Sequence, residues 1–326
     1  MKILNYGSMN LDYVYHVDHF VLPGETVSSE KMQINSGGKG LNQSIALARA
    51  GASVYHAGCC GAGGRQLMAL LKENGIDISC LYTTDEPQGN AFIQVIPSGE
   101  NSIVVFPGSN HCITEEQVSR TLSQFGEGDY LLLQNEISLL PLIVEKACAK
   151  GMKILLNPSP YNAAINTLDF GKLDWLLVNE VETEQITGCQ DTDAAWERIH
   201  ASYPELSVLF TLGSDGSKAF RVNNAGIQMV CQNAFRSDAV DTTGAGDTYT
   251  GYFIGGLMRG LPLQESMRQA SMASALSVRK PGAASSIPVM EEVLAALAGV
   301  YFDRERAEEF HAPNCMAIEP GEEIIQ

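Results

Sequence analysis

A run of small residues that ends in an aspartate is the clearest candidate for chemistry in this sequence. The run Asp241-Thr-Thr-Gly-Ala-Gly-Asp247 precedes an apolar periodic pattern that predicts a helix through Met258. Small residues before a helix let backbone N–H groups converge, and the helix dipole adds positive potential there. A carboxylate at that point can accept a proton from a hydroxyl that attacks a bound phosphate. The simpler alternative is a tight helix entry with Asp247 as a dipole partner.

A second glycine-rich run, Asn35-Ser-Gly-Gly-Lys-Gly-Leu-Asn42, opens another predicted helix that extends to Gly51. This run is not a Walker A loop, because Lys39 is followed by glycine and not by serine or threonine. Its glycines permit close backbone approach, and Lys39 and Asn42 can hydrogen-bond a polyhydroxylated ligand.

A third polar motif, Asn10-Leu-Asp12, follows the first predicted strand. Because one residue separates them, Asn10 and Asp12 can point to the same side and both reach ligand hydroxyls. Taken singly, Asp12 is more typical of a turn.

Strand-like runs alternate with helical patterns along most of the chain, which indicates βα units around a largely parallel sheet. The predicted strands are Ile3–Gly7, Leu131–Leu133, Ile154–Leu156, Trp175–Val178 and Val208–Thr211. Polar or small residues end the later strands, namely Gln134, Asn157, Asn179 and Gly213. Ligands of open α/β sheets bind beyond the carboxyl ends of the strands, so we expect the site there.

Two segments interrupt this alternation, at residues 12–35 and 89–106. Each contains two β-like runs split by a turn signal, which predicts a small accessory sheet that lies over the strand ends as a lid. Plain surface loops are the alternative. The last segment, 301–326, has seven acidic residues against two arginines and indicates a solvated acidic tail.

The charge balance excludes some partners but names no ligand. The 326 residues include 21 Lys and Arg against 38 Asp and Glu, a net charge of −17. Nucleic acids and anionic membranes need a basic face, so we expect neither as a partner. The eight cysteines are scattered without a Cys-x-x-Cys pair, and no signal peptide or membrane-length apolar run is present. These features favour a cytoplasmic protein.

The three motifs together resemble those of the ribokinase-like carbohydrate kinase family. Further matching pieces follow in chain order: Pro107-Gly-Ser-Asn110, Glu136, Asn157-Pro158, Asn179 to Glu184, Thr211 to Gly216, and Gly282 to Pro288. The match covers about residues 1–300. It implies an α/β fold, a three-layer αβα sandwich with a central mostly parallel sheet and a small β-sheet lid. On this basis, 1–300 is one kinase domain that carries the lid segments, and 301–326 is the tail.

The resemblance implies ATP-dependent phosphorylation of a primary sugar hydroxyl, in the first place conversion of D-ribose to D-ribose 5-phosphate. It makes Asp247 the general base and assigns the N–H groups of Gly244, Ala245 and Gly246 to an anion hole for the transferred phosphoryl group. The sugar-binding positions implied are Asn10, Asp12, Gly38, Lys39, Asn42, Glu136 and Asp247, with Ala91 and Ile103 covering the sugar from the lid.

The same resemblance implies ATP as co-substrate, Mg²⁺, and K⁺ as a monovalent activator. The ATP positions are Asn179, Thr211, Gly213, Ser214, Gly216, Gly246 and Ser271. Asn179 and Glu182 correspond to the element that places Mg²⁺. The K⁺ positions are Asp241, Thr243, Ser277, Lys280, Gly282 and Ser286. The lid strands are also expected to pair in a homodimer, since exposed strand edges invite pairing.

Two departures from the family pattern leave the substrate open. The run Cys60-Gly-Ala-Gly-Gly-Arg65 is about two residues shorter than in the family and lacks its aspartate, and Gln88-Gly89 replaces a common Thr-Gly. A kinase for another sugar or a nucleoside, fructose-like or adenosine-like, therefore stays possible. A non-catalytic sugar-binding regulator is disfavoured by the intact Gly-Ala-Gly-Asp247. A phosphosugar kinase is disfavoured because residues 89–110 hold no Lys or Arg. A Rossmann oxidoreductase is disfavoured because the glycine-rich turn that such an enzyme has after its first strand is absent from this sequence.

Overall fold

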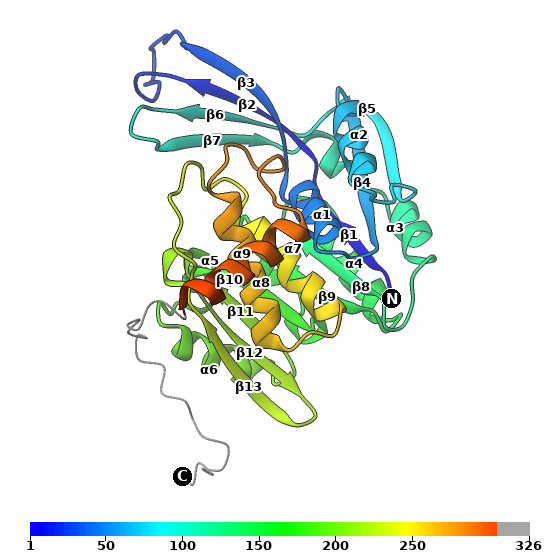
Figure 1. The fold of residues 1–326 in the computed structure, drawn as a ribbon. Coiled ribbons are helices and arrows are strands. Elements are labelled where there is room, and N and C mark those ends of the chain that lie inside the picture. The colour runs from blue at the N-terminus through cyan, green and yellow to red at the C-terminus, as the bar shows by residue number, and fades with distance from the viewer. Residues whose placement is uncertain (305–326) are drawn as a thin grey trace.

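The computed structural model describes residues 1–304, which form the layered body and the projecting sheet of Figure 1. The last helix, α9 (Met290–Arg304), includes the first four residues assigned to the acidic tail, and the rest of that tail lies outside the described residues. Within the described part of the chain, no helix combines the length and the apolar character needed to cross a bilayer.

The central sheet of the described chain has nine strands in the order β13-β12-β11-β10-β9-β8-β1-β4-β5. The strands from β11 to β5 run parallel, and β12 and β13 are antiparallel. In chain order they are β1 (Ile3–Tyr6), β4 (Val54–Ala62), β5 (Leu81–Pro87), β8 (Tyr130–Gln134), β9 (Lys153–Asn157), β10 (Trp175–Asn179), β11 (Ser207–Thr211), β12 (Ser217–Asn223) and β13 (Gly226–Gln232). The apolar runs predicted as strands lie in this sheet, because continuous apolar strands suit a sheet covered on both faces.

Helices cover both faces of the sheet, which confirms the three-layer αβα architecture. One layer packs into an apolar core with α1 (Lys39–Arg49), α2 (Arg65–Glu73), α7 (Ala245–Met258), α8 (Leu263–Ser277) and α9. The opposite layer contains α3 (Glu115–Leu122), α4 (Leu140–Cys148), α5 (Glu180–Thr187) and α6 (Thr192–Ser202) around a second core. Short 3-10 turns occupy Gly108–His111, Ala163–Thr167, Phe170–Lys172 and Gly213–Asp215.

Two glycines allow α1 and α7 to pack unusually closely. A Cβ atom built on Gly251 would lie 2.3 Å from the Ala46 Cβ, and one on Gly255 would lie 2.7 Å from the Ala50 Cβ. No side chain fits at either position without a shift of the helices. Because each helix begins at one of the two glycine-rich runs, this packing brings the beginnings of both helices to one place in the fold.

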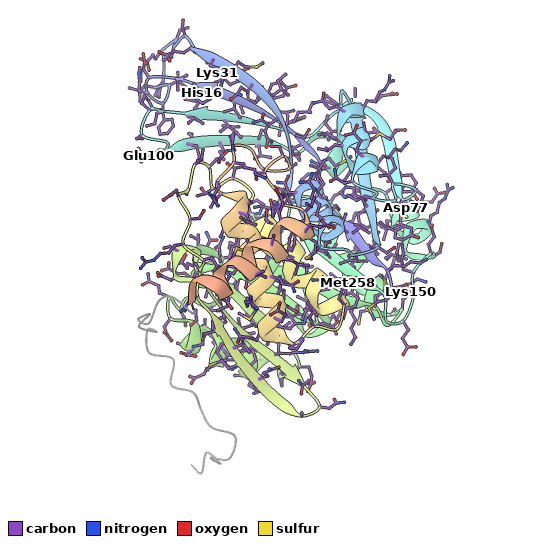
Figure 2. All side chains as sticks on the ribbon, in the orientation of Figure 1. His16, Lys31, Asp77, Glu100, Lys150 and Met258 are labelled. Atoms are coloured by element: carbon purple, nitrogen blue, oxygen red, sulfur yellow. The ribbon has the colours of Figure 1, made fainter. Side chains whose placement is uncertain are left out.

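The lid predicted from the two interrupting segments is a separate four-stranded sheet in the described chain. Its order is β3 (Lys31–Gly37), β2 (Asn10–His16), β6 (Asn90–Val95) and β7 (Asn101–Phe106). It projects from the body in Figure 1, and Figure 2 shows His16, Lys31 and Glu100 at its outer end. The alternating run from Tyr13 to Phe20 within residues 12–35 predicts a strand as far as Phe20, but β2 ends at His16, because its pairing with β3 ends at His16 and Lys31.

Candidate active site

A cavity of about 230 Å³ lies at the carboxyl ends of the central strands, where the sequence predicts the site. The ends of β10 and β11 meet there, since Asn179 is paired in register with Thr211. The cavity is lined by Lys39, Asn157, Ser159, Leu177, Val178, Asn179, Glu182, Thr211, Gly244, Gly246, Asp247 and Thr250. The two glycine-rich runs and the strand ends are therefore parts of one site.

The start of α7 presents backbone N–H groups to this cavity. Gly244 is the N-cap residue with φ of 74°, a left-handed conformation that favours glycine, and a Cβ there would lie 2.9 Å from the Ala283 Cβ. A Cβ on Gly246 would meet nothing within 4 Å, so its backbone faces open space. The first N–H groups of a helix have no intrahelical partner, and together with the dipole they suit an anion.

Asp247 is held in the first turn of α7 by two amide side chains of α1. Asn42 donates from Nδ2 to Asp247 Oδ2 at 2.9 Å, and Gln43 donates from Nε2 to Oδ1 at 2.8 Å. The carboxylate is buried, with 8% of the residue exposed. Each oxygen keeps a free lone pair, so the group can still accept a proton from a ligand.

The charges of three carboxyl groups act on Lys39, which also lines the cavity. Burial lowers the pKa of Lys39, but the charges of Asp247, Glu136 and Glu182 outweigh burial and raise its pKa above the ordinary value. Burial raises the pKa of Glu136 above its ordinary value. The charge of Lys39 and a hydrogen bond from Ser8 lower this pKa, but by less than burial raises it. The Lys39 backbone N–H donates to Glu136 Oε2 at 3.0 Å. Lys39 is thus a charged ammonium group set among acceptors, which suits recognition of hydroxyl groups.

Asp12 lies close enough to Glu136 and Asp247 to be affected by their charges. Burial has the largest effect on Asp12, and together with the charges of these two carboxylates it raises the pKa of Asp12 to about 7. Gly37 makes room for Asp12, since a Cβ on Gly37 would lie 1.9 Å from Asp12 Oδ2. Gly38 allows close approach of the neighbouring backbone, since a Cβ there would lie 2.8 Å from the backbone N of Asn10.

Asn10 is fixed by Asn110, the last residue of the predicted Pro107–Asn110 motif. Asn110 donates from Nδ2 to Asn10 Oδ1 at 2.7 Å, and its own Oδ1 accepts from the Met9 N–H at 3.0 Å. The side chain of Asn10 therefore has a defined orientation at the start of β2.

The lid residues named from the resemblance lie on one face of the lid sheet. Ala91 is paired in register with Asp12 on β2 and with Val105 on β7, and Ile103 is two residues from Val105. Directly paired residues, and residues two apart on one strand, point to the same face. Ala91 is buried and Ile103 is half exposed. Both therefore share the face of Asp12, with Ile103 farther out.

The residues expected to bind nucleotide lie at the ends of β10 and β11 and beside α8. Asn179 caps α5 in a reciprocal pair with Glu182: the Glu182 N–H donates to Asn179 Oδ1 at 2.8 Å, and Glu182 Oε2 accepts from the Asn179 N–H. Asn179, Glu182, Thr211 and Gly246 line the cavity. The remaining expected positions lie outside its lining, on the turn after β11 and on α8; they are Gly213, Ser214, Gly216 and Ser271.

The positions expected to bind K⁺ form a neighbouring loop pair. Asp241 accepts from the N–H groups of Thr243 at 2.9 Å and Gly282 at 2.8 Å. Burial raises its pKa, but these bonds prevail and lower it below the ordinary value. Ser277 and Ser286 donate to carbonyls of the same region, whereas Lys280 is paired with Glu292 at 3.2 Å. Among the described residues, no group of three His, Cys, Asp or Glu side chains gathers at metal-binding distance.

Gln43 was missed by reasoning from the sequence, although it touches Asp247. An amide inside a predicted helix carries no distinctive pattern, and only its place directly after Asn42 pointed to it. Gln43 is fully buried, so its importance depends on the contact with α7 that the tertiary fold makes.

Fold and site together define a three-layer α/β protein with a projecting small sheet and a buried carboxylate in the first turn of a helix that begins at the cavity. The sequence profile of the pfkB family carbohydrate kinases matches residues 1–290, so the chain belongs to this family and the predicted class is confirmed. It is 37% identical over 298 residues to a ribokinase of Haemophilus influenzae, covering 88% of this chain and 95% of that one.

Solved structures give the same result for the fold. A ribokinase of Cryptococcus neoformans in complex with ADP superposes with a TM-score of 0.80 at 31% identity, covering 90% of this chain and 99% of that one. An Arabidopsis thaliana ribokinase complexed with ribose and ATP superposes with a TM-score of 0.78 at 26% identity, over 91% and 98% of the two chains.

Proposed function

We propose that this protein transfers the γ-phosphoryl group of ATP to the primary hydroxyl of D-ribose and releases D-ribose 5-phosphate and ADP. The observation that carries the proposal is the buried Asp247 carboxylate in the first turn of α7, next to the backbone N–H groups at the start of that helix, of which Ala245 donates to the Thr242 carbonyl at 3.2 Å. Support also comes from the relatives named ribokinase, one of them solved with ribose and ATP.

In this proposal the sugar lies between α1, β2 and α7. Asn10, Asp12, Lys39, Asn42 and Glu136 offer donors and acceptors to its hydroxyl groups. Gly38 lets the backbone come close, and Ala91 and Ile103 cover the sugar from the lid. Closing the lid excludes water that would compete as phosphoryl acceptor.

The chemical step needs positioning and charge stabilisation more than covalent catalysis. Asp247 takes the proton of the primary hydroxyl while the hydroxyl oxygen of the sugar bonds to the γ-phosphorus. At the same time the bond between the γ-phosphorus and the β–γ bridging oxygen breaks, which frees ADP. The N–H groups of Gly244, Ala245 and Gly246 stabilise the negative charge on the transferred group.

The nucleotide is proposed to extend along the ends of β10 and β11 toward α8. Asn179 and Glu182 fit Mg²⁺ through water, because an amide and a carboxylate supply oxygen atoms and this ion keeps much of its hydration shell. The oxygens near Asp241, Thr243, Gly282 and Ser286 fit K⁺, with Ser277 and Lys280 in the adjoining segment. These two ions supply positive charge that an acidic chain lacks.

We infer in addition that two copies pair through their lids and act in the cytoplasm. The lid face opposite Asp12 carries exposed apolar side chains, which favour burial against a second copy. They are Met32, Ile34, Phe92, Val104 and Phe106. The free thiols of Cys59, Cys60, Cys80, Cys112, Cys148 and Cys189 fit a reducing compartment.

The test is a coupled assay of ADP release with ATP, Mg²⁺ and K⁺, using ribose, deoxyribose, fructose and adenosine as acceptors. We expect the highest kcat/KM with ribose and no turnover by Asp247→Asn, which retains sugar binding. If another acceptor gives a higher kcat/KM than ribose, that sugar or nucleoside is the substrate. Sugar binding by the wild-type protein without ADP release identifies a regulator, and near-native turnover by Asp247→Asn excludes Asp247 as the base.

A further inference from the structure

A chain of buried amide side chains connects the Asp247 carboxylate with the centre of the molecule. Gln43 donates from Nε2 to Asp247 Oδ1 at 2.8 Å and to Asn157 Oδ1 at 3.0 Å. Its Oε1 accepts from Nε2 of Gln134, the last residue of β8, at 2.7 Å. Gln134 also donates to Asn5 Oδ1 at 3.0 Å. Gln43, Gln134 and Asn5 are all fully buried, so solvent does not compete for these bonds.

Backbone carbonyls at both ends determine which way each amide is turned. Asn5 donates from Nδ2 to the Gly40 carbonyl at 2.8 Å, and a carbonyl can only accept. Asn5 therefore presents its oxygen to Gln134, Gln134 presents its NH₂ group to Gln43, and Gln43 has only its NH₂ group left for Asp247. At the other end Asn157 donates to the Leu177 carbonyl at 3.0 Å, so it too presents its oxygen to Gln43.

From this geometry we propose that Gln43 is a positioning residue for the base Asp247, and that Gln134 sets the orientation of the Gln43 amide. The proposal rests on the proposed function, in which Asp247 takes the hydroxyl proton. The carboxylate is fixed at both oxygens, by Gln43 at Oδ1 and by Asn42 at Oδ2. Asn42 also belongs to the proposed sugar site, whereas Gln43 is fully buried, does not line the cavity and is not one of the proposed sugar-binding residues. Its contribution is therefore separable from sugar binding.

Charged groups around Asp247 make the loss of one donor costly. Lys39 faces it from α1, and the carboxyl groups of Asp12 and Glu136 are close enough for their charges to be coupled to it. Glu182 lines the same cavity from α5. A carboxylate with one free oxygen in this acidic setting rotates away from the reacting hydroxyl more readily than one held at both oxygens.

The test compares steady-state kinetics of Gln43→Leu, Gln134→Leu and the double variant. Leucine keeps most of the buried volume and removes the donor. We expect kcat of Gln43→Leu to fall about 10- to 100-fold, the loss typical of a removed hydrogen bond to a charged group. KM for ribose and KM for ATP should stay within about threefold of wild type. Gln134→Leu should lower kcat less, and the double variant should match Gln43→Leu, because Gln134 acts through Gln43.

Gln269→Leu is the matched control, since Gln269 is also a buried glutamine, lies on α8 and is bonded to Arg259 and Glu265, which are not residues of the proposed site. Thermal unfolding of every variant reports loss of stability, and Gln43→Met replaces Gln43→Leu if the latter does not fold. Wild-type kcat in the Gln43 variant, or an equal loss in Gln269→Leu, overturns the proposal. If the losses of kcat in the two single variants multiply in the double variant, Gln134 does not act through Gln43, and that part of the proposal is overturned. Asp247→Asn, assayed alongside, shows separately whether the base assignment fails.

Discussion

Asp12 combines a proposed role in sugar binding with an unfavourable position in the folded protein. Its carboxyl group is largely buried, and the nearest charges, on Glu136 and Asp247, are also negative. Replacing Asp12 by asparagine keeps the size of the side chain and removes the charge. We therefore expect Asp12→Asn to make the free protein more stable while it weakens ribose binding.

The magnitude follows from the pKa of Asp12, which rises from an ordinary 3.8 to about 7 on folding. Each pKa unit corresponds to about 1.4 kcal/mol, so ionised Asp12 costs the folded state roughly 4 kcal/mol at most. Because the folded pKa is raised, the cost is absent below the unfolded pKa, grows as the pH rises through the window between 3.8 and 7, and is complete above it. We expect a gain of about 2–4 kcal/mol for Asp12→Asn at pH 8 and almost none at pH 4.

The assay is urea unfolding of wild type and Asp12→Asn at pH 4, 6 and 8, with ribose affinity measured at pH 8. Glu30→Gln, which removes one exposed negative charge from the lid segment, is the control. Ribose affinity should fall at least tenfold, since the sugar loses a charged acceptor. A difference in unfolding free energy that is constant with pH, or an Asp12→Asn protein less stable than wild type at pH 8, would refute the reasoning.

Two further predictions concern the surroundings of the anion hole and the contact between α1 and α7. Replacing potassium by tetramethylammonium should lower the initial rate by about tenfold. The oxygens around Asp241 lie beside the start of α7, and a cation bound there orders this helix start. Equal rates in both buffers would contradict this prediction. Gly251→Val should destabilise the protein by about 1–3 kcal/mol and lower kcat, because its side chain collides with Ala46 and moves Asn42 and Gln43 away from Asp247. Gly299→Ala, where a Cβ meets nothing within 4 Å, is the helical control and should leave kcat unchanged.

Much of the fold could be predicted from local patterns. Apolar runs such as Leu131–Leu133 identify strands because a sheet covered on both faces needs apolar residues throughout. Glycine-rich runs identify the starts of α1 and α7 because only small residues allow such turns. The ends of the lid strands could not be predicted from such patterns. The strand through Tyr13 stops at His16 because its partner strand begins at Lys31, and the partner is known only from the pairing.

The sequence by itself determined the family and the chemical groups of the site, since the motifs carry the residue types that phosphoryl transfer needs. Only the tertiary structure decided how these groups affect one another. Gln43 meets Asp247 across 204 positions of the chain, and Asp12 becomes hard to ionise because folding buries it beside two carboxylates. Such effects depend on how close two groups lie and how deeply they are buried. Both are set when folding brings remote segments of the chain into contact.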